Sequence, residues 1–184
     1  MRWERLFADL EAQLEASDAA ELAGEVVERT RVEVGAIRLV DRLRAAVGGR
    51  LRLSCLGGEV VAGRLERVGP DWLLIAERAD RSSLVPSGAV TAVAGLGALS
   101  APPGSEGRVA ARLDLRYALR GMARDRAPVT ITLADATNVS GTVDRVGSDF
   151  IDVAEHPAGE PRRPRAVRQV RTLPLGGLSV LRAG

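Results

Sequence analysis

Regularly spaced arginines are the residues of this sequence with the clearest chemical potential. Between Gly107 and Arg126 five of them recur every four residues, which aligns them along one side of an α-helix. A row of guanidinium groups can follow a phosphate backbone with salt-sensitive affinity and little sequence preference. The alternative is a solvated helix face with Asp114 and Asp125 as local partners. The row consists of Arg108, Arg112, Arg116, Arg120 and Arg124.

A second arginine cluster lies in the segment 161–171, which holds five arginines and no acid. Its prolines, Pro161 and Pro164, favour an extended and exposed chain. Because loops often carry binding residues, this segment is a second candidate for phosphate contacts. The alternative is a hairpin extension without a function of its own. The arginines of the segment are Arg162, Arg163, Arg165, Arg168 and Arg171.

The sequence contains few residues of the kinds that usually catalyse reactions or bind metal ions. Cys55 is the only cysteine and His156 the only histidine, which leaves nothing for a disulfide, a Cys/His zinc site or a histidine-based triad. No nucleophile, base and orienting group stand at a recognisable spacing. We therefore expect no enzyme, no catalytic residue, no metal and no cofactor. Cys55 lies in a strand-like alternation, which favours a buried and inert thiol.

Charge is distributed unevenly along the 184 residues, although the net charge is only +2. Residues 1–28 hold eight acids against two arginines, and the remainder holds 24 arginines against 16 acids. Such asymmetry indicates an acidic partner for the basic part. The acidic segment is interpreted in three ways: a helical seam with another copy, a docking arm, or a lid over the arginines. No apolar signal core or membrane span is apparent, so we expect a cytoplasmic protein.

The elements that must position these arginines follow from hydrophobic periodicity. Apolar residues recur at helical spacing from Trp3 to about Val47, where Gly48-Gly49 ends the predicted helix. From Leu51 the period changes to two, which predicts short strands separated by glycine and proline turns. We place further strands near residues 60–68, 72–76, 83–85 and 90–93, followed by a linker at 101–105.

An internal repeat organises the chain. A shift of 78 residues places Gly63–Glu77 on Gly141–Glu155 without a gap, as counted from the sequence. Trp72 and Phe150 then occupy equivalent positions, which favours packing over base stacking for both. The second copy carries about ten extra residues, within the arginine-rich segment 161–171.

The repeated unit resembles the Sm-like family of small β-barrels, which includes bacterial Hfq. The residues that carry the resemblance are Thr130–Asp135, Gly141-Thr142-Val143 and Leu173-Pro174, with Gly63-Arg64-Leu65 and Val85-Pro86 in the first copy. The whole chain also resembles uncharacterised proteins of high-GC bacteria that are sometimes labelled Fis-type regulators. The resemblance implies an α+β, mainly β protein with two tandem Sm-like (SH3-like) five-stranded antiparallel barrels, each preceded by a helix. The implied divisions are an N-terminal helical arm at 1–47, a first barrel at 48–100, a linker and second helix at 101–126, and a second barrel at 127–184.

Two functional hypotheses follow from the sequence. The first is a nucleic-acid-associated accessory or regulatory protein that favours RNA over DNA and uses the two arginine clusters on a duplicated scaffold. The second is a protein-protein assembly module with no role in nucleic-acid binding. In either case we expect a homo-oligomer, formed through barrel edges or through the N-terminal helix, and no membrane partner.

Overall fold

The computed structural model describes residues 13, 34–78, 81–160, 162–163 and 165–183. The chain divides into two compact units, residues 1–38 and residues 39–184. Most of the predicted N-terminal helical arm therefore lies outside the described residues. In the described part of the chain, no helix is both long and apolar enough to cross a membrane.

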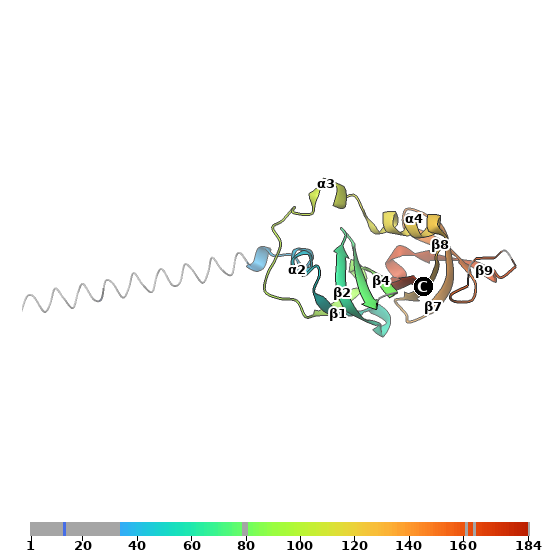
Figure 1. The fold of residues 1–184 in the computed structure, drawn as a ribbon, viewed down its shortest axis with the longest axis horizontal. Coiled ribbons are helices and arrows are strands. Elements are labelled where there is room, and N and C mark those ends of the chain that lie inside the picture. The colour runs from blue at the N-terminus through green and yellow to red at the C-terminus, as the bar shows by residue number, and fades with distance from the viewer. Residues whose placement is uncertain (1–12, 14–33, 79–80, 161, 164, 184) are drawn as a thin grey trace, which may run out of the picture. The chain divides into compact units, whose positions relative to one another are not determined.

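Ten strands dominate the unit 39–184 (Figure 1). In the strands at residues 50–55 and 60–68, alternation of buried and exposed side chains matches the period of two in the sequence. The first five strands are β1 (Arg50–Cys55), β2 (Val60–Val68), β3 (Trp72–Arg78), β4 (Arg81–Pro86) and β5 (Val90–Ala94). The second five are β6 (Pro128–Leu133), β7 (Asn138–Val146), β8 (Phe150–Glu155), β9 (Gln169–Pro174) and β10 (Leu178–Ala183). Single 3₁₀ turns span Leu56–Gly58, Ser87–Ala89 and Leu175–Gly177.

One continuous antiparallel sheet contains all ten strands, in the order β5-β1-β2-β3-β4-β10-β6-β7-β8-β9. The expectation of two separate five-stranded barrels is therefore wrong. The sheet does not close on itself, and β4 pairs with β10 to join its two halves. The physical reason is that an unpaired edge strand leaves backbone N–H and C=O groups without hydrogen-bond partners. Pairing of β4 with β10 removes one such edge from each half of the sheet.

The two halves repeat each other in strand order and in register. Leu51 pairs with Gly63 in the first half, and Val129 pairs with Gly141 in the second, at the offset seen in the sequence. The orders β5-β1-β2-β3-β4 and β10-β6-β7-β8-β9 correspond strand by strand. Each residue of the first half can therefore be compared with its counterpart in the second.

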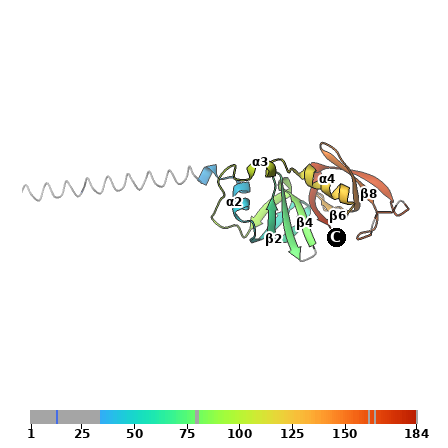
Figure 2. The ribbon, with the colours of Figure 1, turned by 45° about the horizontal axis from the view of Figure 1, so that its top comes forward.

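Three short helices with described bounds accompany the sheet: α2 (Leu39–Ala45), α3 (Gly107–Ala110) and α4 (Leu115–Asp125), shown from a second side in Figure 2. The helix expected across 107–126 is interrupted between α3 and α4. Asp114 causes this restart, because its carboxylate accepts a hydrogen bond from the Tyr117 N–H at 2.8 Å and so caps α4. The predicted first helix is likewise not continuous to Val47, since residues 37–38 are not helical.

Two hydrophobic clusters form the core, and each receives side chains from both halves. The cluster of the second half includes Trp72 and Leu84 from the first half. The cluster of the first half includes Val180 from β10. Because the clusters exchange side chains across the β4-β10 junction, the two halves are packed as one body.

Candidate nucleic-acid interface

Helix α4 is held at its start by residues of the first half. The Leu115 backbone N–H donates to Asp71 Oδ1 at 2.7 Å, and the Trp72 indole N–H donates to the Leu113 carbonyl oxygen at 2.7 Å. The first bond satisfies an N–H that has no partner within the helix. Trp72 is buried, which supports its expected packing role. These two hydrogen bonds fix the orientation of helix α4 independently of its arginines.

The structure separates the predicted row of five arginines into parts. Arg108 belongs to α3, and Arg112 lies exposed in the break between α3 and α4. Arg116, Arg120 and Arg124 lie on α4 at intervals of four residues, so they share one side of that helix. A continuous row therefore extends only over the last three positions.

The arginine-rich segment meets the end of α4 at a single acid, Asp144 on β7. Arg126, the residue that follows α4, donates to Asp144 Oδ1 at 2.7 Å. Arg162 of the segment donates to Asp144 Oδ2 at 2.9 Å. The two clusters that are separate in the sequence are therefore adjacent here, and Arg163 and Arg165 lie exposed beside Arg162 in the chain.

The last two arginines of the segment both contact Glu155 on β8. Arg168 is exposed, and its backbone N–H donates to the Glu155 carbonyl oxygen at 2.9 Å. Arg171 lies on β9, where its Nε is 2.5 Å from Glu155 Oε1. The charge of Arg171 is thus largely matched by a neighbouring strand. We define the arginine surface as Arg116, Arg120, Arg124, Arg126, Arg162, Arg163 and Arg165.

Ion pairs leave much of the arginine surface available to an anionic ligand. Arg116 pairs with Asp114 at 2.6 Å and Arg124 with Asp125 at 3.3 Å, both at exposed or half-exposed positions where such pairs contribute little. Partial burial acts to raise the pKa of Asp114. The hydrogen bond from the Tyr117 N–H and the charge of Arg116 outweigh this effect and lower the pKa below its usual value. Within the described part of the chain Arg120, Arg163 and Arg165 make no ion pair.

Comparison with known proteins provides no further guide to this interface. No protein-family model matches the chain, and no curated protein matches it.

Tyr117 is a candidate contact that the sequence reasoning did not identify. It lies on α4 and its side chain is 58% exposed, although large apolar rings usually pack inward. Positions 117, 120 and 124 fall on one face of a helix, so the ring lies on the same side as Arg120 and Arg124. The signal for this placement in the sequence is the spacing of three residues between Tyr117 and Arg120.

The only cysteine and the only histidine of the sequence are both buried. Burial, reinforced by Glu59, raises the pKa of the Cys55 thiol to about 11, so the reactive thiolate is scarce at neutral pH. His156 Nδ1 donates to the Pro157 carbonyl oxygen at 3.0 Å, and its Nε2 lies 2.8 Å from the Thr142 hydroxyl oxygen, within hydrogen-bond distance. Among the described residues no three His, Cys, Asp or Glu side chains are grouped to hold a metal ion.

Proposed function

We propose that this protein binds single-stranded nucleic acid, RNA in preference to duplex DNA, through the arginine surface, and acts as an accessory or regulatory factor. The observation that carries the proposal is the double contact of Asp144. Because Arg126 and Arg162 share this carboxylate, the end of α4 and the arginine-rich segment form one basic area. A phosphate backbone is the biological polymer whose charge density suits such an area.

The acids within the arginine surface do not cancel its charge. Asp114, Asp125 and Asp144 each have at least one arginine partner, and the surface contains seven arginines in all. The excess positive charge would attract phosphates over about 10 Å at moderate salt and release their counterions on contact. Guanidinium groups also form paired hydrogen bonds with phosphate oxygens, which favours arginine for this task.

Tyr117 supports the preference for single strands. An exposed aromatic ring among cations can stack on a base that is not held in a duplex, and such stacking contributes about 1–3 kcal/mol per base. Bases of single-stranded RNA loops are accessible in this way, whereas those of duplex DNA are not. Phosphate contacts alone would not distinguish the two polymers.

Fluorescence anisotropy with mixed-sequence single-stranded RNA and duplex DNA, at several salt concentrations, tests the proposal. The variant Arg120→Gln/Arg163→Gln/Arg165→Gln removes three charges and breaks no ion pair among the described residues. We expect its RNA affinity to fall at least about tenfold, and the slope of log K against log salt to shrink by about 2. The variant Tyr117→Leu should weaken RNA binding with little change of slope, because stacking releases no counterions.

A matched control has the same net charge change on the first half of the sheet: Arg50→Gln/Arg52→Gln/Arg78→Gln, three exposed positions. If this control loses as much affinity as the first variant, binding follows net charge and the arginine surface is not the site. Absence of RNA binding by the unmodified protein at low salt would also contradict the proposal.

Assembly with other copies of the chain is a second candidate function, and the β4-β10 junction favours it. The two edge strands of the sheet, β9 and β5, are the counterparts of β4 and β10 in the repeat. Pairing of β9 with β5 of another copy would therefore reproduce a junction that already exists within the chain. Val170 on β9 is 58% exposed, which is unusual for a strand residue of its size.

Contacts of this kind join unlike edges, so they produce a ring or an open chain of copies. We expect an oligomer in sedimentation velocity, and dissociation to a monomer in the variant Val170→Lys/Ala94→Lys, which places a charge on each edge. A variant with lysines at two exposed positions off the edges, Ala62→Lys/Ala136→Lys, serves as the control. A protein that remains monomeric at high concentration excludes this function.

A further inference from the structure

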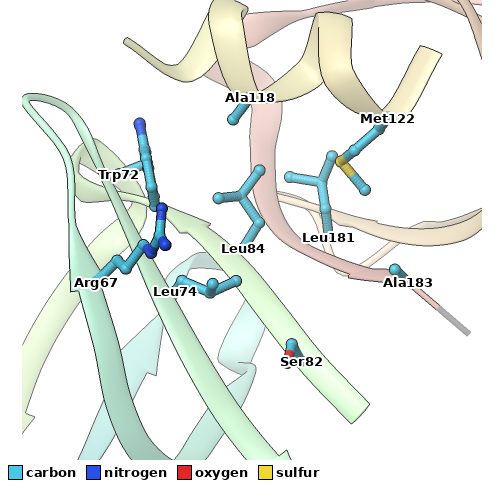
Figure 3. A pocket seen from close by; sticks show the side chains of 9 residues that line it. All are labelled: Arg67, Trp72, Leu74, Ser82, Leu84, Ala118, Met122, Leu181 and Ala183. Atoms are coloured by element: carbon cyan, nitrogen blue, oxygen red, sulfur yellow. The ribbon is translucent and has the colours of Figure 1, made fainter. Parts of the chain in front are cut away.

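An apolar groove of about 280 Å³ lies beside the β4-β10 junction (Figure 3). Its walls come from the first half of the sheet on one side and from α4 and β10 on the other. The apolar side chains that line it are Trp72, Leu74, Leu84, Ala118, Met122 and Leu181. The groove shares no residue with the arginine surface.

Three of the side chains that line the groove carry polar atoms: Arg67, Trp72 and Ser82. The Trp72 indole N–H points to the Leu113 carbonyl, so the groove receives the ring and not the donor. Leu74 and Met122 remain only half-buried in the folded protein. Apolar surface left accessible inside a concave site favours a ligand with an apolar part.

Arg67 lies at the end of this groove beside Trp72 (Figure 3). Its counterpart in the second half, Arg145, stands opposite Asp152 in the strand register and lies 3.8 Å from its carboxylate. In the first half the residue opposite Arg67 is Leu74. The acid of the second half is therefore replaced by a leucine, and in the described part of the chain Arg67 makes no ion pair.

A second position also carries a polar residue in the second half and an apolar residue in the first half. In the second half the Thr172 hydroxyl donates to Asp152 at 2.7 Å. Its counterpart in the first half is Leu84, which pairs with Leu74 in the strand register. A polar pair has become an apolar pair, whereas the cation has been kept. The first half thus combines an unmatched guanidinium with an apolar groove, and the second half does not.

We propose that this groove binds a medium-chain acyl carboxylate. The acyl chain lies along Leu74, Leu84 and Met122, and the carboxylate takes the place beside Arg67 that Asp152 takes beside Arg145. A guanidinium and a carboxylate form paired, charge-assisted hydrogen bonds, which fixes the orientation of the ligand. The combination of one cation and an apolar wall selects against neutral lipids and against polar anions.

Isothermal titration calorimetry of the full chain with hexanoate, octanoate and decanoate tests the proposal. Affinity should rise about fourfold with each added methylene until the groove is filled, since each buried methylene adds a constant increment. Octan-1-ol should bind at least about tenfold more weakly than octanoate, because it lacks the charge that Arg67 recognises. Absence of heat with all three carboxylates, or affinities independent of chain length, would overturn the proposal.

Two substitutions locate the binding. Arg67→Gln should lower octanoate affinity at least about tenfold and leave that of octan-1-ol unchanged, whereas the matched variant Arg145→Gln should change neither. Ala183→Leu, at a half-buried position in the groove wall, should weaken both ligands by filling the space. Equal effects of Arg67→Gln and Arg145→Gln, or undiminished binding in Ala183→Leu with an intact thermal transition, would place the binding elsewhere and overturn the proposal.

Discussion

We expect replacement of Arg182 by Met to lower the free energy of unfolding by about 3 kcal/mol, a loss that urea denaturation at pH 7 would measure. Arg182 on β10 donates to Glu59 Oε2 at 2.7 Å and to Glu77 Oε1 at 3.1 Å, so one cation joins two carboxylates of the other half. Its side chain is only 13% exposed. Met keeps the apolar stem but removes the cation that both partly buried carboxylates contact, which is the costly part of breaking such a pair.

A control for this variant is Arg124→Met, which breaks the exposed pair with Asp125. We expect it to change stability by less than about 0.5 kcal/mol, because exposed pairs contribute little. An equal loss of unfolding free energy in both variants would show that the charge of Arg182 stabilises the fold no more than that of an exposed arginine does.

Acid should reduce the difference between the Arg182→Met variant and the unmodified protein. Burial raises the pKa of Glu77, but hydrogen bonds from Ser83 and Arg182 outweigh it, and the folded-state pKa lies below the usual 4.5. The stabilisation is therefore complete above the unfolded pKa and is lost as the pH falls through the folded one. A deficit of the variant that is the same at pH 7 and near pH 4 would indicate lost packing instead of lost charge.

The strands could be predicted from the sequence because their signals are local. Periods of two and glycine turns placed β2 at residues 60–68, as observed, and the others within a few residues. The joined sheet could not be predicted, because it depends on contacts such as that of Arg182 with Glu77, 105 residues apart in the chain. No local pattern indicates which edge of one half pairs with which edge of the other.

The candidate interface shows the same division between local and distant information. The spacing of Arg116, Arg120 and Arg124 on α4 follows from the sequence, because one turn of helix fixes it. The same spacing also predicted Arg112 and Arg108 as part of the row, because the pattern of arginines does not show that Asp114 caps a new helix. Adjacency of the two clusters depends on Asp144, a strand residue with no distinguishing local signal.

Replacement of Gly63 by Ala is the second change with a large expected effect, a loss of about 3 kcal/mol in the free energy of unfolding. An added Cβ at this buried position of β2 would come within 3.0 Å of the Ala76 carbonyl oxygen on β3 and of Ile75 Cγ2. The carbonyl belongs to the backbone and has no alternative rotamer. The β2-β3 pairing must therefore open to admit the methyl group.

Gly88→Ala is the matched control, since an added Cβ there meets no atom within 4 Å, and its stability should change by less than about 1 kcal/mol. Gly141, the counterpart of Gly63, has the same close approach to the Ala154 carbonyl, so Gly141→Ala should cost a similar amount. Because one sheet joins both halves, each variant should shift a single cooperative transition. Separate unfolding of the two halves in calorimetry of Gly63→Ala would contradict the coupling through β4 and β10, and an unchanged midpoint would contradict the close approach of the strands.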